Sequence, residues 1–461
     1  MRGISVARAG AGLSVLALLV AATVGPPAAV GAARATGELD PTFGDNGVVV
    51  TTFPDLPAGA SGIAVQGGHS FVAVGGGLAE NAPDFLLARY RGDGTLDPHF
   101  GSGGRVVTPL PAATGADGAE AVAIQPDRRI VAVGTAGLGH GDDIGFVVVR
   151  YLPDGALDKS FGVNGIAITP VGPAGVAGGS GVVVQPDGKI VVVGGANDDN
   201  QNALFAAARY LPNGTLDASF GNGGTVLVLI PGGDAAANAV ALQSDGRIVL
   251  AGTAIGPGFV GQQFAVVRLT SGGQPDSTFG NNGIVVAQNV FSQGKGGAED
   301  VVIGRDGRIL AAGLGETEAG KGAFGLMRFL SDGSLDTTFG AGNGMVVTEF
   351  AGGESGARSV LLRPDGRIVA AGAAGFPSTF ALAGYLADGG LDTTFGDCGR
   401  TTTAIGDNAG ISGAVLQPNG RVVVAGTTAN SDLTAGSFAL ARYLGKHDGY
   451  GNPPTCPVTG P

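Results

Sequence analysis

The chain has 461 residues, of which 88 are glycine and none is tryptophan, and its formal net charge at pH 7 is −12. Only 14% of the residues are charged and 44% are hydrophobic, a composition that excludes an intrinsically disordered chain. The glycines follow no three-residue period, which excludes collagen, and a glycine inside a helix costs up to about 1 kcal/mol. We therefore expect a β protein that is rich in turns.

Residues 1–35 have the pattern of a signal peptide for export. Two arginines lie near the start, an apolar run follows from Leu13 to Val24, and small residues precede the expected cleavage between Ala35 and Thr36. Cleavage after Ala32 is an alternative. The apolar run is too short for a membrane anchor, which needs roughly 20 apolar residues. We expect a secreted protein.

Without residues 1–35 the net charge becomes −15, because that segment holds three arginines and no acidic residue. This charge repels phosphate backbones and anionic membrane surfaces, so neither nucleic acid nor a membrane is an expected partner. No later apolar run reaches the length of a membrane span. The expected mature protein is a soluble monomer whose partner is an unknown protein or glycan ligand.

One phrase, Leu-Asp-x-x-Phe-Gly with a single exception at the leucine, recurs seven times at intervals of 56 to 61 residues. A second phrase, for example Gln185-Pro186-Asp187-Gly188, lies between two apolar runs and predicts a tight β-hairpin. A third phrase, Arg-Tyr after an apolar run, ends most units. The phrases divide residues 36–444 into repeat units near 36–92, 93–153, 154–212, 213–271, 272–331, 332–387 and 388–444.

Each unit contains four predicted strands, which in the third unit are Gly165–Pro170, Ser180–Gln185, Lys189–Gly194 and Phe205–Leu211. The middle strands are continuously apolar, which indicates burial on both faces. Seven such units predict an all-β fold, a seven-bladed β-propeller with four antiparallel strands per blade. Because the fourth strand carries an arginine, we expect it to face solvent and blade seven to end at Leu444 without strand exchange. Exchange of the N-terminal strand is the alternative.

These three phrases together resemble the bacterial delta-60 repeat, a family assigned to the β-propellers. The resemblance covers essentially the whole chain after residue 35 and implies the propeller fold. It implies no catalytic residue and no cofactor, because none is established for the family. The sequence departs from the pattern locally, for example at Gly384, where the other six units have arginine.

The two cysteines, Cys398 and Cys456, are expected to form a disulfide because the protein is expected to be exported. Two free thiols are the alternative. Residues 445–461 form a tail that is rich in proline and glycine and has no strand pattern. The disulfide would hold this tail against the last repeat.

The repeated aspartate is the first candidate for chemistry, because carboxylate oxygens can bind calcium. The spacing does not match an EF-hand loop, so we expect no cofactor, with calcium as the alternative. Each aspartate is instead expected to accept backbone N–H bonds or to pair with the arginine of the fourth strand. The repeated phenylalanine is expected to fill the gap between adjacent blades. These structural residues are Asp40, Asp97, Asp158, Asp217, Asp276, Asp336 and Asp392, with Phe43, Phe100, Phe161, Phe220, Phe279, Phe339 and Phe395.

Threonine occupies one position of the first strand in five units, namely Thr51, Thr108, Thr169, Thr348 and Thr403. The next position holds Gln288 and Glu349 in two units. If the first strand lines the central channel, these side chains form a polar ring there. Threonine is also simply a good strand former, so the pattern has a structural explanation as well.

No catalytic motif stands out, and the four histidines fall at unrelated places in their units. We therefore expect a binding or scaffold protein that engages its ligand at one end of the ring. The variable segments Gly195–Ala203 and Gly313–Gly322 are candidate ligand loops. The alternative is an enzyme, a lyase or hydrolase with a small site at the channel mouth, formed by Glu349, Gln288 and a histidine.

Overall fold

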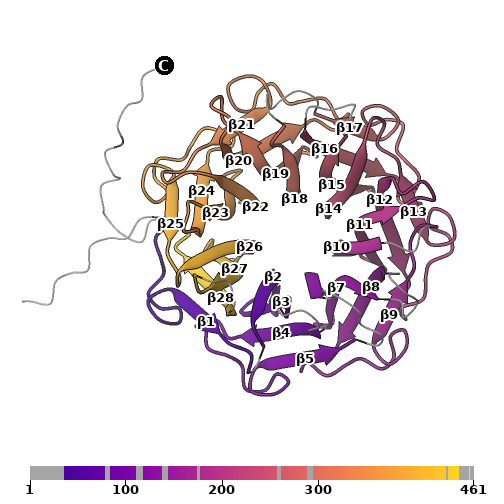
Figure 1. Cartoon of the computed structure of the whole chain (residues 1–461), viewed down its shortest axis with the longest axis horizontal. Coiled ribbons are helices and arrows are strands. Elements are labelled where there is room, and N and C mark those ends of the chain that lie inside the picture. Colours follow the sequence, from indigo (N-terminus) through magenta and orange to yellow (C-terminus); the bar gives the residue numbers. More distant parts are fainter. Residues whose placement is uncertain are drawn as a thin grey trace, which may run out of the picture.

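The computed structural model describes residues 36–54, 56–77, 84–110, 118–137, 144–173, 177–256, 261–287, 294–431, 435–445 and 456. Within these ranges the chain forms seven four-stranded antiparallel sheets and no helix. The sheets stand radially around a central axis, each with one strand nearest that axis (Figure 1). The chain is therefore a seven-bladed β-propeller, and the fold predicted from the repeat is confirmed.

The blades are numbered here in chain order, and their strands are given from the axis outward. Blade 1 contains β2 (Ala58–Gln66), β3 (Ser70–Gly77), β4 (Asp84–Tyr90) and β5 (Arg105–Pro109); blade 2, β6 (Gly118–Ile124), β7 (Ile130–Gly137), β8 (Ile144–Tyr151) and β9 (Ile166–Thr169); blade 3, β10 (Ala177–Val184), β11 (Ile190–Asn197), β12 (Ala203–Tyr210) and β13 (Thr225–Val228); blade 4, β14 (Asp234–Leu242), β15 (Ile248–Ile255), β16 (Gln262–Leu269) and β17 (Ile284–Val286). Blade 5 contains β18 (Gly297–Ile303), β19 (Ile309–Glu316), β20 (Gly322–Phe329) and β21 (Met345–Thr348); blade 6, β22 (Ser355–Leu362), β23 (Ile368–Ala374), β24 (Thr379–Tyr385) and β25 (Arg400–Thr403); blade 7, β26 (Asn408–Leu416), β27 (Val422–Ala429), β28 (Gly436–Tyr443) and β1 (Val48–Thr51).

The N-terminal strand closes the ring. β1 pairs with β28 of the last blade, with Val48 opposite Ala441, so the expectation of closure without strand exchange is wrong. That expectation assumed that the arginine-bearing strand faces solvent, whereas it is the third strand of its blade. Arg209 on β12, for example, is only 5% exposed, because Asp217 rather than water balances its charge.

Both ends of the described ring build one turn together. In the other blades a continuous turn such as residues 152–158 follows the third strand. In blade 7 the N–H of Leu444 donates to the carbonyl of Glu38, and the N–H of Gly37 donates to the carbonyl of Leu444. The same bonds join Leu152 to Ala156 and Gly155 to Leu152 in the second blade. The two chain segments therefore replace one unbroken turn.

Seven apolar clusters hold the blades together, and each lies between two neighbouring blades. The repeated phenylalanines are buried in these clusters, with exposed fractions of 0 to 1%. Phe220, for example, packs against residues of blades 3 and 4. Their place between blades is the one expected from the sequence. Radial packing thus buries both faces of every sheet, as the continuously apolar strands require.

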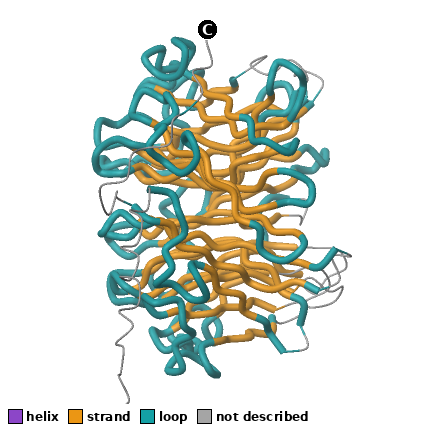
Figure 2. The backbone as a smooth tube through the Cα atoms, turned by 90° about the vertical axis from the view of Figure 1, so that its left-hand side faces the viewer, coloured by secondary structure: helices purple, strands orange, loops and turns teal. Residues whose placement is uncertain are grey.

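The ring has two faces, and the strands run between them (Figure 2). On one face a tight turn, such as residues 185–189, joins the two innermost strands of each blade. We call this the hairpin face.

Cys398, in the turn before β25, is joined to Cys456 by a disulfide with a Cα–Cα distance of 5.5 Å. The signal-peptide prediction falls on residues 1–35, which lie outside the described residues, and no helix in the described part is long and apolar enough to cross a membrane.

Candidate functional site

The repeated aspartate, arginine and phenylalanine form one structural junction. In blade 3 the Arg209 Nε atom donates to a carboxylate oxygen of Asp217 at 2.9 Å, and its guanidinium lies 4.5 Å from the centre of the Phe220 ring. The Arg209 Nη1 atom also donates to the carbonyl of Ser271 in the next blade. Each junction therefore ties two blades together. Five other blades contain the same arginine–phenylalanine contact, at 4.4 to 4.7 Å.

The carboxylate of Asp217 is fully engaged within this junction. Its other oxygen accepts bonds from the hydroxyl and the backbone N–H of Ser219. The bond from the Ser219 hydroxyl, together with the charges of Arg209 and Lys189, outweighs the effect of burial and lowers the pKa of Asp217 to about 2. Both contacts expected from the sequence are thus present, and they give the aspartate a structural role.

Blade 6 lacks the arginine, because Gly384 stands in its place, and a second substitution takes over one of its bonds. The hairpin position that usually holds a buried glutamine is Arg363 here. The Arg363 Nη1 atom donates to the carbonyl of Gly445, which corresponds to the carbonyl of Ser271 in blade 4. The inter-blade bond is kept, although it comes from a different strand.

The five candidate threonines lie on the outermost strands and not on the strands nearest the axis, so the channel alternative for them is wrong. Each accepts a hydrogen bond from a buried tyrosine hydroxyl of the following blade, at 2.8 to 2.9 Å. In the two remaining blade pairs both positions are apolar. Val228 and Leu269 lie in one apolar cluster, and Ala287 and Phe329 lie in another. Threonine therefore occurs where tyrosine needs an acceptor. The pairs are Thr51 with Tyr90, Thr108 with Tyr151, Thr169 with Tyr210, Thr348 with Tyr385 and Thr403 with Tyr443.

The other sequence candidates do not meet in the channel. Glu349 is exposed at the end of the outermost strand β21, so its predicted place at the channel mouth is wrong, and Gln288 lies outside the described residues. The candidate loop Gly195–Ala203 is a closed turn in which Asp198 accepts backbone bonds from Asn200 and Asn202 at 2.9 Å. In the part of the chain that the structure describes, no group of three or more His, Cys, Asp or Glu is placed to hold a metal ion.

A ring of polar side chains that the sequence reasoning missed surrounds the axis. Each innermost strand contains one extra residue that has no partner on the next strand, a β-bulge, near its middle. A bulge redirects the side chain that it carries. All seven of these side chains line one cavity of about 680 Å³ on the axis. We call them the bulge ring: Ser61, Glu120, Ser180, Asn238, Glu299, Arg358 and Ser412.

A glycine on the second strand of each blade makes room for the bulge. A Cβ atom at Gly194 would lie 1.8 Å from the carbonyl oxygen of Gly178, two residues before the bulged Ser180. The corresponding glycines of the other blades have the same contact, at 1.8 to 2.0 Å. None of them has a positive φ, so close approach, and not turn geometry, requires glycine. They are Gly75, Gly134, Gly194, Gly252, Gly313, Gly372 and Gly426.

Blades 5 and 6 contribute an acid–base cluster to the ring. Glu299 and Arg358 form an ion pair of 2.9 Å, and Asp300, next to Glu299, reaches blade 6. One Asp300 oxygen accepts bonds from the hydroxyl of Ser359 at 3.0 Å and the N–H of Val360 at 2.8 Å. Burial raises the pKa of Asp300, and although these bonds lower it again, the pKa remains at about 6. This cluster holds three of the four charged side chains that line the cavity of the bulge ring.

Glu120 is the second carboxylate of the ring and has no cationic partner among the described residues. The channel wall shields the Glu120 carboxylate from water and so raises its pKa, and a hydrogen bond with Ser61 lowers this pKa in part. Burial also raises the pKa of Glu299, although Arg358 opposes this. Blades 2 and 5 lie on opposite sides of a seven-bladed ring, so these carboxylates face each other across the channel. Asn238 is held by a bond from its Nδ2 atom to the carbonyl of Ala298, at 2.8 Å. The ring thus offers donors, acceptors and two carboxylates of raised pKa.

A sequence signal for this ring exists, because each of its residues lies five positions before the hairpin position of Gln185 and its equivalents. Ser180, for example, precedes Gln185 by that interval. The residues around it are mostly glycine, alanine and valine. One polar residue at a fixed place in an otherwise apolar strand is the pattern that marks the channel.

Seven segments of the chain match one family model, described as "Domain of unknown function (DUF5122) beta-propeller": residues 72–100, 125–161, 185–220, 243–279, 304–339, 363–395 and 417–445. Together they cover about half of the chain. The chain belongs to this family. The resemblance to a propeller repeat family is thereby confirmed, although the match does not carry the delta-60 name. None of the curated proteins matches this DUF5122 propeller.

Among solved structures, the DUF5122 propeller is similar to a polysaccharide lyase of family PL25, an ulvan lyase, with 13% identity and a TM-score of 0.48, over 89% of this chain and 97% of that chain. A protein from Lactobacillus plantarum shows 14% identity and a TM-score of 0.43, over 84% and 98% of the two chains. A glucose dehydrogenase shows 13% identity and a TM-score of 0.43, over 86% and 99%. These activities belong to the similar proteins and are not assigned to the DUF5122 propeller.

The tyrosine–threonine pairs predict a specific pattern of stability. We expect Thr51→Val to lower the free energy of unfolding by about 1–3 kcal/mol, because the buried Tyr90 hydroxyl loses its acceptor. Adding Tyr90→Phe should restore most of this loss, because the apolar pairs of the DUF5122 propeller already show that a pair without hydroxyls packs. Denaturant unfolding measures both variants. A double variant whose loss equals the sum of the two single losses would contradict this account.

The raised pKa of Asp300 predicts a pH dependence. Its pKa of about 6 lies above the ordinary 3.8, so between these pH values the folded state binds more protons than the unfolded state. Stability should therefore fall as the pH rises through this window, and Asp300→Asn should remove that contribution. We expect the unfolding free energy of the wild type, relative to Asp300→Asn, to fall by about 2 kcal/mol between pH 4 and 6. A difference that stays constant would show that Asp300 titrates normally.

Proposed function

We propose that this protein binds a small, hydroxyl-rich ligand, such as a saccharide unit, at the bulge ring. The observation that carries the proposal is that the bulge position is polar in all seven blades but of four residue types. The structural positions behave differently, since aspartate and phenylalanine are each identical in all seven units. A position that is always polar and always on the axis, yet varies in kind, fits recognition of an asymmetric ligand better than support of the ring.

The chemistry of the ring supports a ligand with hydroxyl groups. Carboxylates accept hydrogen bonds from the hydroxyl groups of a ligand, and the Arg358 guanidinium donates to the hydroxyl oxygens. Serine hydroxyls can both donate and accept. Most ring groups are held by neighbours, as in the Glu299–Arg358 ion pair, so they are oriented before a ligand arrives. A cavity with a few convergent polar groups is the usual form of a small-molecule site. The predicted secretion of the protein would place this site where external glycans are available.

A second candidate function is catalysis by the same ring, as a glycoside hydrolase or lyase. It is favoured by the raised pKa values of Glu120 and Glu299, which suit general acid–base chemistry. Two carboxyl groups that flank one bond are the usual requirement for glycoside hydrolysis. Binding is the preferred function, because Arg358 holds one of the two carboxylates in an ion pair.

A glycan array of plant, algal and bacterial polysaccharide fragments tests the proposal. We expect the wild-type protein to bind at least one glycan, and Glu120→Gln to weaken that binding about tenfold through the loss of a charge-assisted hydrogen bond. Glu349→Gln is the matched control, because Glu349 is an exposed acid on an outer strand. It should leave binding unchanged.

Binding to no glycan, or binding that Glu120→Gln leaves unchanged, would contradict the proposal. The bound glycan is then incubated with the protein and its products are separated by chromatography. Cleavage that depends on Glu120 would establish the enzyme in place of the binding protein.

A further inference from the structure

Between the bulge ring and the hairpin face, the channel changes from polar to apolar. A cavity of about 770 Å³ lies in this part, against the innermost strands β10, β14, β18, β22 and β26. Its wall consists largely of aliphatic side chains, among them Val183, Leu242, Ile303, Leu362 and Leu416. An aliphatic wall of this size inside a solvent channel is suited to the apolar part of a ligand.

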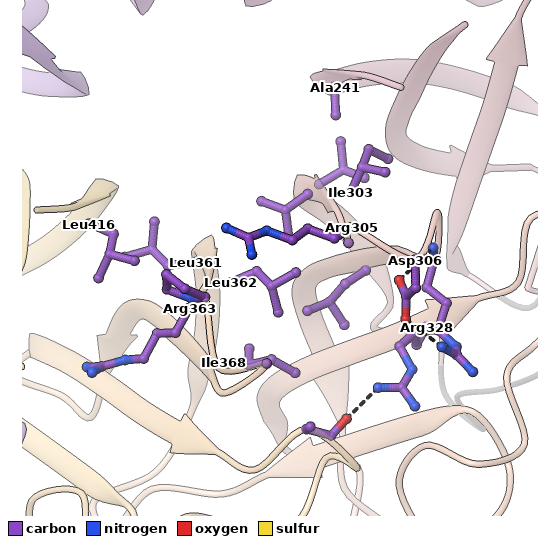
Figure 3. A pocket seen from close by; sticks show the side chains of 18 of the residues that line it. Ala241, Ile303, Arg305, Asp306, Arg328, Leu361, Leu362, Arg363, Ile368 and Leu416 are labelled. Atoms are coloured by element: carbon purple, nitrogen blue, oxygen red, sulfur yellow. Dashed lines mark hydrogen bonds and ion pairs between the residues drawn. The ribbon is translucent and has the colours of Figure 1, made fainter. Parts of the chain in front are cut away.

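One arginine side chain without a described partner extends into this cavity. Figure 3 shows the side chain of Arg305 extending from the end of β18 across the cavity toward Leu361 and Leu416. Arg305 is exposed, and no described residue forms a hydrogen bond or an ion pair with it. Its guanidinium is therefore available to a ligand.

The side chain of every other arginine of this cavity has at least one described partner. Arg308 pairs with Asp306 and, at 2.9 Å, with Asp336. Arg328 pairs with Asp336 at 2.7 Å, and Arg363 donates to the carbonyl of Gly445. Arg305 is thus the one arginine of this wall whose side chain forms no hydrogen bond or ion pair with a described residue.

The repeat itself shows that Arg305 is not needed for the turn. The equivalent position holds a proline in four blades, glycine in one and serine in another: Pro126, Pro186, Pro364, Pro418, Gly67 and Ser244. The preceding position, which is glutamine in five blades, is Gly304 here. All these turns form without a cation at the position of Arg305. Structure alone therefore gives no reason for arginine at this place.

We infer that this cavity binds an aliphatic carboxylate, with the carboxylate on Arg305 and the chain on the aliphatic wall. Guanidinium groups bind carboxylates through two parallel N–H···O bonds, and a partly apolar setting strengthens such pairs. An aliphatic alcohol would lack the charge, and an inorganic anion would gain nothing from Leu242, Ile303 or Leu362. The inference does not depend on the saccharide proposed for the bulge ring.

Isothermal titration calorimetry with octanoate tests this inference. We expect the wild-type protein to bind octanoate, and Arg305→Gln to weaken the affinity about tenfold or more, because a charge-assisted pair is lost. 1-Octanol should bind weakly and equally to both proteins, and sulfate should not compete at equal concentration. Arg128→Gln is the matched control, because Arg128 is exposed in another turn of the hairpin face and does not line the cavity.

Three results would overturn the inference. They are no binding of octanoate to the wild type, equal binding to Arg305→Gln, and binding of sulfate as tight as that of octanoate. Because Arg305 is exposed and its turn forms elsewhere without arginine, the variant is expected to keep the wild-type melting temperature, which is measured alongside. Glycan binding measured in the same variant separates this site from the bulge ring, since Arg305→Gln should leave it unchanged.

Discussion

The close contact between each bulged inner strand and the glycine opposite it determines what this ring can do. At Gly194 there is no space for a Cβ atom, because the carbonyl of Gly178 occupies it. The bulge that follows turns Ser180 toward the axis. The same contact in every blade produces a ring of seven polar side chains within a wall whose other residues are mostly glycine, alanine and aliphatic residues. The candidate site is therefore a consequence of strand geometry and not of a loop.

Most of the charge that repeats in this chain serves the scaffold. The arginine of the third strand is buried against aspartate and phenylalanine and bonds to the next blade, as Arg209 does. The tyrosine–threonine pairs tie neighbouring blades in the same way. Because these contacts recur in most units, the residues that do not repeat become informative. The varied bulge ring and the single Arg305 are such residues, and both face the channel.

The repeat was sufficient to predict the fold, the four strands of each unit and the burial of the phenylalanines. Two residues were misplaced for the same reason, because a polar side chain was taken to indicate contact with solvent. Arg209 was expected at solvent, and the channel was one of two alternatives for Thr169. Instead, Arg209 is buried beside Asp217, which lies eight residues along the chain, and Thr169 is buried beside Tyr210 of the next blade. Pairing of this kind depends on which strand is third and which is fourth in a blade. The sequence of one unit cannot show this, because the fourth strand comes from the following unit.

The bulge ring was missed for a different reason. A bulge is a property of two paired strands, and neither strand alone reveals it. The signal that could have located the ring is the alignment of the units with one another, since Glu120, Ser180 and Arg358 fall at one offset from the hairpin turn. The two ends of the described ring were equally hard to place, because Glu38 and Leu444 form part of one turn only in the closed ring.

The bulges direct their side chains into an accessible channel. Cysteine labelling tests this placement most directly. Both native cysteines are joined in a disulfide, so a cysteine placed at Ser180 would be the one free thiol. We predict that a small charged thiol reagent modifies Ser180→Cys in the native protein at a rate near that of Val163→Cys, whose position is 77% exposed. Val192→Cys, at a fully buried position on the next strand, should not react. If Ser180→Cys is as unreactive as Val192→Cys, the bulge ring does not line an open channel and the account is wrong.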